Sequence, residues 1–165
     1  MLKFRNIFLT GFIFCFSVLL AAYYIEYQLL IEPCPLCLLQ RIVFALIGLV
    51  FFIGYLANPV NIGRYLSSAM ISLFAMMGIA LAARQIWLQH LPPDQVPSCS
   101  AGVERLLELY PILDVLSLIL KGTAECAEID FEILTLPLSN WSLLGFSGFF
   151  FISIALIVLQ KKRRI

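Results

Sequence analysis

Charged residues are scarce in this chain of 165 residues. They make up 13% of it, whereas a soluble domain has about 25%. Apolar residues make up 62%, against about 45–50% in soluble proteins. This composition excludes intrinsic disorder and argues against a soluble globule, which would expose too much apolar surface. The net charge of +1 gives no field that would attract nucleic acid.

Histidine occurs once, and cysteine five times. A structural zinc site usually needs two close pairs of cysteine or histidine ligands. Only one close pair, Cys34 and Cys37, is present, so we expect no metal site. The chain also carries no motif for haem, flavin or nucleotide binding.

Long apolar runs, in contrast, are plentiful. A spanning helix needs roughly 20 mostly apolar residues, because the hydrocarbon core is about 30 Å thick. Four stretches qualify, so we predict an all-α fold: a four-helix transmembrane bundle forming a single integral membrane domain over residues 1–165. The predicted spans are residues 7–25, 37–57, 65–83 and 141–159. In the second span only Ile42–Ala57 is free of charge, so a full span must begin near Leu36 and include Gln40 and Arg41.

The beginning of the chain has a second interpretation. Met1–Ala22 also fits a signal peptide, with a basic start, an apolar run and small residues at its end. The run is long for a signal peptide, and aromatic residues follow it. We therefore predict a first span, and the orientation of the remaining spans is the same in both cases.

Basic and acidic residues are sorted to opposite sides of the predicted spans. All ten acidic residues fall in segments 26–36 and 84–140. Basic residues without acidic neighbours flank the other ends of the spans: Lys3, Arg5, Arg64 and Lys161–Arg164. Because basic loops stay in the cytoplasm, we predict that both termini are cytoplasmic and that the two acidic segments lie outside.

The outer segment 84–140 is too polar to span. Within it, Val103–Lys121 has apolar residues at helical spacing, interrupted at Pro111. A short amphipathic helix lying in the outer interface would give this pattern. A solvated helix of the loop would give it equally well, and the pattern alone leaves both open.

Four of the five cysteines lie on the outer side. Cys34 and Cys37 stand at the mouth of the second span, and Cys99 and Cys126 stand in the long outer segment. Disulfides form and persist outside the cytoplasm. The simplest pairing is Cys34–Cys37 and Cys99–Cys126, although four cysteines allow three connectivities. Cys15, in the middle of the first span, is expected only to pack as a small apolar residue.

The two pairs suit different purposes. A bridge between Cys99 and Cys126 would close a loop whose constraint is worth about 3 kcal/mol. A bridge between Cys34 and Cys37 closes almost no loop and adds little stability, and such small rings are more often redox centres. Cys37 also falls near the N-terminus of the second span, where the helix dipole and N–H groups favour a thiolate.

Arg41 follows Cys37 by four residues, so it lies on the same helix face one turn deeper. A cation there favours the thiolate and can bind a carbonyl oxygen. The alternative is an arginine that only snorkels to the headgroups. A disulfide at a membrane mouth needs an external oxidant, and a quinone, flat and apolar, fits this location. Whether Glu26, Gln40, Gln85 or His90 contributes is left open by the sequence.

These residues resemble a known family. The run Glu32–Arg41, with Cys-x-x-Cys-x-x-x-Arg spacing, resembles the signature of the bacterial disulfide bond formation protein B family. Trp87–Cys99 is similar to the entry of its second outer loop. Glu125–Glu128, followed by Trp141, is similar to the exit of that loop and the fourth span. The resemblance covers nearly the whole chain.

The resemblance implies a protein-disulfide:quinone oxidoreductase in the bacterial inner membrane. A DsbA-like periplasmic thiol oxidase would attack the Cys99–Cys126 bridge at Cys99. Electrons would pass to Cys34–Cys37, and Cys37 would deliver them to ubiquinone or menaquinone beside Arg41. The rival interpretations are a four-span scaffold with two structural disulfides and a thiol oxidoreductase of the vitamin K epoxide reductase type. That second type carries its membrane Cys-x-x-Cys late in the chain.

Overall fold

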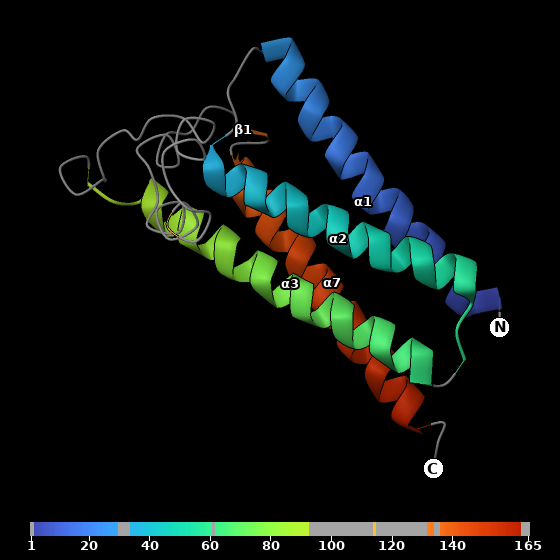
Figure 1. Cartoon of the computed structure of the whole chain (residues 1–165). Coiled ribbons are helices and arrows are strands. Elements are labelled where there is room, and N and C mark those ends of the chain that lie inside the picture. Colours follow the sequence, from blue (N-terminus) through green and yellow to red (C-terminus); the bar gives the residue numbers. More distant parts are fainter. Residues whose placement is uncertain are drawn as a thin grey trace.

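The computed structural model describes residues 2–29, 34–60, 62–92, 114, 132–133 and 136–162. Four long helices dominate it (Figure 1): α1 (Leu2–Leu29), α2 (Pro35–Ala57), α3 (Ile62–Gln89) and α7 (Leu138–Lys162). All four are long and apolar enough to cross a membrane, which confirms the predicted all-α architecture with four transmembrane helices.

Segment 84–140 adds one feature that the sequence did not predict. Two short strands, β1 (Glu132–Ile133) and β2 (Leu136–Pro137), pair in antiparallel fashion immediately before α7. The amphipathic helix expected within Val103–Lys121 lies outside the described residues, apart from Asp114.

The helices are longer than the predicted spans. Each predicted span lies inside one helix, and α2 begins at Pro35, close to the expected start near Leu36. Hydropathy marks the part of a helix that lies in hydrocarbon, whereas the helix itself continues until its backbone hydrogen bonds end. The extension matters most in α3, which continues through Arg84 and Gln85 to Gln89.

Neighbouring helices in the chain are also neighbours in space. α1 packs on α2, α2 on α3, and α3 on α7. The start of α1 and the end of α7 lie at one end of the bundle, together with the α2–α3 link (Figure 1). The start of α2 and the end of α3 lie at the opposite end, so the features at the start of α2 are remote from both termini.

Phenylalanine rings packed against glycines hold the helices together. Phe8, Phe51 and Phe146 are fully buried. The ring of Phe146 lies over Gly78 of α3, where an added Cβ would come within 2.5 Å of ring carbons. Lipid gives membrane helices no hydrophobic driving force to associate, so close packing at small residues supplies much of the attraction. Gly78 is therefore what allows α7 to approach α3.

We expect Gly78→Leu to destabilise the bundle, because the added side chain would displace the Phe146 ring. Overpacking of this kind costs about 1–3 kcal/mol, which lowers the Tm by about 2–12 °C in a chain of this size. Thermal unfolding of the detergent-purified protein measures the effect. Gly148→Leu is the matched control, since a Cβ there meets no atom within 4 Å. Equal Tm values for the two variants would contradict this packing argument.

Candidate functional site at the mouth of α2

The start of α2 is built around its two cysteines. Pro35 occupies the first turn, where its fixed φ suits a helix and its missing N–H is not needed. Cys34 is the N-cap residue, and its Sγ accepts a hydrogen bond from the backbone N–H of Cys37 at 3.3 Å. Both sulfur atoms therefore lie at the positive end of the α2 dipole, which favours thiolates.

A glutamine from α3 reaches both sulfurs. The Nε2 of Gln85 lies 3.1 Å from Cys37 Sγ and 3.6 Å from Cys34 Sγ. The Oε1 of Gln85 accepts a hydrogen bond from Nε2 of Gln40, on α2, at 2.7 Å. Gln40 and Gln85 are 4% and 5% exposed, so their amides can be satisfied only by protein partners.

The sequence left the contribution of both glutamines open and did not predict that they pair. Gln40 follows Cys37 by three residues and faces α3, whereas Arg41 pairs with α1, and Gln85 lies beyond the predicted end of the third span at residue 83. One signal was present in the sequence. A polar amide inside an apolar helix must find a partner, because lipid offers none.

Arg41 is held by α1. Its Nη1 forms an ion pair with Oε2 of Glu26, and its Cζ lies 5.0 Å from the centre of the Tyr23 ring. The side chains of Arg41 and Glu26 are 15% and 30% exposed. A snorkelling arginine would extend its charge towards the headgroups. In the structure the guanidinium is paired with a carboxylate near the end of the neighbouring helix, and this pair is compatible with either interpretation.

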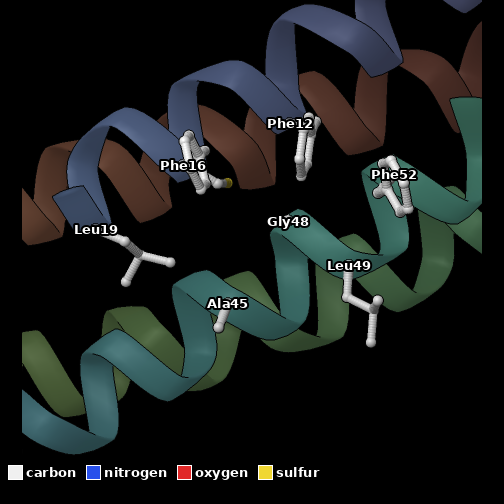
Figure 2. A pocket seen from close by; sticks show the side chains of 8 residues that line it. Phe12, Phe16, Leu19, Ala45, Gly48, Leu49 and Phe52 are labelled. Carbon is white, nitrogen blue, oxygen red and sulfur yellow. The ribbon is translucent and has the colours of Figure 1, made fainter.

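An apolar groove of about 200 Å³ lies between α1 and α2 (Figure 2). On the α2 side, Ala45 and Leu49 follow Arg41 at steps of four residues, so the groove continues the Arg41 face along α2, away from the cysteines. Its lining residues are Phe12, Cys15, Phe16, Leu19, Ala45, Gly48, Leu49 and Phe52. Cys15 is 1% exposed and packs against Gly48, which agrees with its expected role as a small apolar residue.

The structure thus brings three of the predicted site residues, Cys34, Cys37 and Arg41, to the same end of α2. Cys99 and Cys126 lie outside the described residues, and their predicted pairing is not tested. The described residues contain no group of three His, Cys, Asp or Glu side chains that could hold a metal. The exposed His90 follows α3 directly, with Nδ1 2.8 Å from the carbonyl oxygen of Ile86.

Four membrane helices with a cysteine pair at the N-terminus of one of them define a membrane-embedded thiol oxidoreductase. The comparisons with known proteins give the family. The family model for disulfide bond formation protein DsbB matches residues 4–156. Disulfide bond formation protein B of Hahella chejuensis is 43% identical over 145 residues, which are 88% of each chain.

Two further relatives agree. Disulfide bond formation protein B of Chromohalobacter salexigens is 41% identical over 150 residues, covering 90% of this chain and 87% of the relative. Disulfide bond formation protein B 1 of Pseudomonas aeruginosa is 40% identical over 150 residues, covering 91% and 92%. The chain belongs to the disulfide bond formation protein B family. It is a protein-disulfide:quinone oxidoreductase, which reoxidises DsbA and passes the electrons to quinone.

Proposed function

We propose that Cys34 and Cys37 form the bridge that faces quinone, and that Cys37, as a thiolate, delivers the electrons beside Arg41. The observation that carries this proposal is the shared position of the two sulfurs at the N-terminus of α2, with one amide group in reach of both. Helix dipole and amide hydrogens both favour the charged sulfur over the neutral one.

The proposed route uses both cysteine pairs. A thiolate of the DsbA-like periplasmic oxidase attacks Cys99, which breaks the Cys99–Cys126 bridge and forms a mixed disulfide. The second thiol of the oxidase resolves it, leaving the oxidase with its disulfide and this chain with two thiols. Exchange with the Cys34–Cys37 bridge then moves the reducing equivalents inward. Two electrons and two protons leave the oxidase in each cycle, and quinone, as the second substrate, takes up both as hydroquinone.

Arg41 is suited to bind a quinone carbonyl. A guanidinium carries five N–H donors, so Arg41 can keep its ion pair with Glu26 and still donate to a carbonyl oxygen. Ubiquinone and menaquinone both present such oxygens on a flat apolar ring. DsbA is a strong oxidant, so its regeneration needs an acceptor that is more oxidising still.

The groove between α1 and α2 suits the isoprenoid tail of a quinone. Its lining is formed by aromatic and aliphatic side chains together with Cys15 and Gly48, and it continues from Arg41 along the same face of α2. A quinone ring held by Arg41 would therefore have apolar surface below it for the attached chain.

We further propose that the protein lies in the bacterial inner membrane with both termini in the cytoplasm. The distribution of charge supports this orientation, because the basic residues Lys3, Arg5 and Arg64 all belong to the end of the bundle that holds the termini. Cys34 and Cys37 then lie at the periplasmic face, within reach of an oxidase that works there.

Cys37→Ser is expected to abolish quinone reduction while the fold survives, because serine cannot supply the electron pair. The measurement is the loss of quinone absorbance after purified protein is mixed with a reduced thioredoxin-fold dithiol. Ser67→Ala, on α3 and outside the groove, is the control and should turn over at the parent rate. Full turnover by Cys37→Ser would refute the assignment.

Arg41→Ala is expected to raise the KM for quinone by about tenfold to a hundredfold, with a smaller effect on kcat. A hydrogen bond to a charged group is worth about 1.5–3 kcal/mol, and 1.4 kcal/mol corresponds to tenfold. Steady-state kinetics with quinone as the varied substrate measure this split. Glu26→Gln, which keeps the guanidinium but removes its ion pair, should raise the KM less. Unchanged KM and kcat in Arg41→Ala would leave the arginine without a role in quinone binding.

Ala45→Phe is expected to fill the groove and to raise the KM for a long-tailed quinone more than the KM for a short-tailed analogue. Ala45 is exposed on α2, so the larger side chain displaces no core residue. Leu73→Phe, on the lipid-facing side of α3 at 64% exposure, adds a ring outside the groove and serves as the control. Equal effects on the two quinones would exclude the groove as the site of the tail.

A further inference from the structure

We propose that the Gln85 side chain donates a hydrogen bond to the Cys37 thiolate, and that Gln40 holds Gln85 in the orientation that makes this possible. The inference rests on the proposed function, in which the Cys34–Cys37 pair passes its electrons to quinone. It assigns Gln85 as a residue that touches a reacting atom and Gln40 as a positioning residue.

The geometry fixes which end of the Gln85 amide faces the sulfurs. Because Nε2 of Gln40 donates to Oε1 of Gln85, the NH₂ group of Gln85 is directed at Cys37 and Cys34. With both amides reversed, an oxygen would face the sulfurs, and a thiolate has no hydrogen to give it. The observed orientation is thus the one that a reduced, charged cysteine requires.

Burial makes the contact selective for one redox state. A thiolate accepts a hydrogen bond much more strongly than a disulfide sulfur does, because charge-assisted hydrogen bonds are about twice as strong as neutral ones. Gln40 and Gln85 are buried and Cys37 is partly buried, so water competes little for the amide end of this contact, which strengthens the interaction further. Gln85 therefore stabilises the reduced pair more than the oxidised bridge, and so raises the reduction potential of Cys34–Cys37. A higher potential at this pair draws electrons inward from Cys99–Cys126.

The test measures that potential directly. Full-length protein carrying Cys99→Ser and Cys126→Ser is equilibrated with glutathione, without added quinone. Two glutathione thiols reduce one Cys34–Cys37 bridge and leave as one glutathione disulfide, and mass spectrometry after alkylation gives the reduced fraction. Gln85→Met should lower the equilibrium constant for reduction about tenfold, which is about 30 mV towards more negative potential.

Gln89→Met is the matched control. Gln89 lies one turn further along α3, and its Oε1 accepts a hydrogen bond from Ser139 Oγ of α7 at 2.7 Å. Its substitution also removes a bond between helices, but that bond does not involve the cysteines. The potential should stay at the parent value. An equal shift in Gln85→Met and Gln89→Met would show that loosened helix packing is the cause, and would overturn the inference.

If Gln85→Met fails to accumulate in the membrane, Gln40→Met provides a second test of whether the orientation of Gln85 affects the potential. It leaves the Gln85 amide in place but removes the donor that orients it, so the potential should shift in the same direction by a smaller factor of about three. A parent-like potential in Gln40→Met or Gln85→Met overturns the inference while the proposed function stands. A parent protein without any reducible Cys34–Cys37 bridge overturns the proposed function, and this inference with it.

Discussion

The hydrogen bond between Gln40 and Gln85 is the interaction on which the rest of the site depends. It joins α2 to α3 at the depth of the cysteines, in surroundings where an unpaired amide has no water to turn to. Because Oε1 of Gln85 is bonded to Gln40, the NH₂ group of Gln85 is directed at the two sulfurs. A requirement of membrane folding, that polar groups satisfy one another, thereby also sets the surroundings of a redox centre.

A second polar pair, Arg41 with Glu26, does the same between α2 and α1. Two polar pairs at a single turn of α2 thus connect it to α1 and to α3. In hydrocarbon, each of these side chains would be costly without its partner. Below this level the bundle is held by aromatic rings seated on glycines, as in the contact of Phe146 with Gly78. The apolar packing sets the distances between the helices, and the polar pairs at the mouth fix their rotation about their axes.

Much of this architecture could be predicted from the sequence because it depends on local patterns. Hydropathy gave the four spans, and the spacing of Cys34, Cys37 and Arg41 placed them on one helix start. Gln40–Gln85 and Glu26–Arg41 could not be found in this way. Their members are 45 and 15 residues apart, and they meet only because of how neighbouring helices are rotated. The ends of α1 and α3 were also missed, since hydrogen-bonded helix continues past the apolar run.

The position of Cys34 has a consequence for protein engineering. One sulfur atom both caps α2 and belongs to the redox pair, so architecture and chemistry cannot be adjusted independently at this residue. Serine is the substitution that separates them, because its hydroxyl is among the best N-caps and has no thiol chemistry. Cys34→Ser therefore exchanges a single atom, keeps the start of α2 intact and removes electron transfer. Such a variant could hold a molecule bound at this site without turning it over.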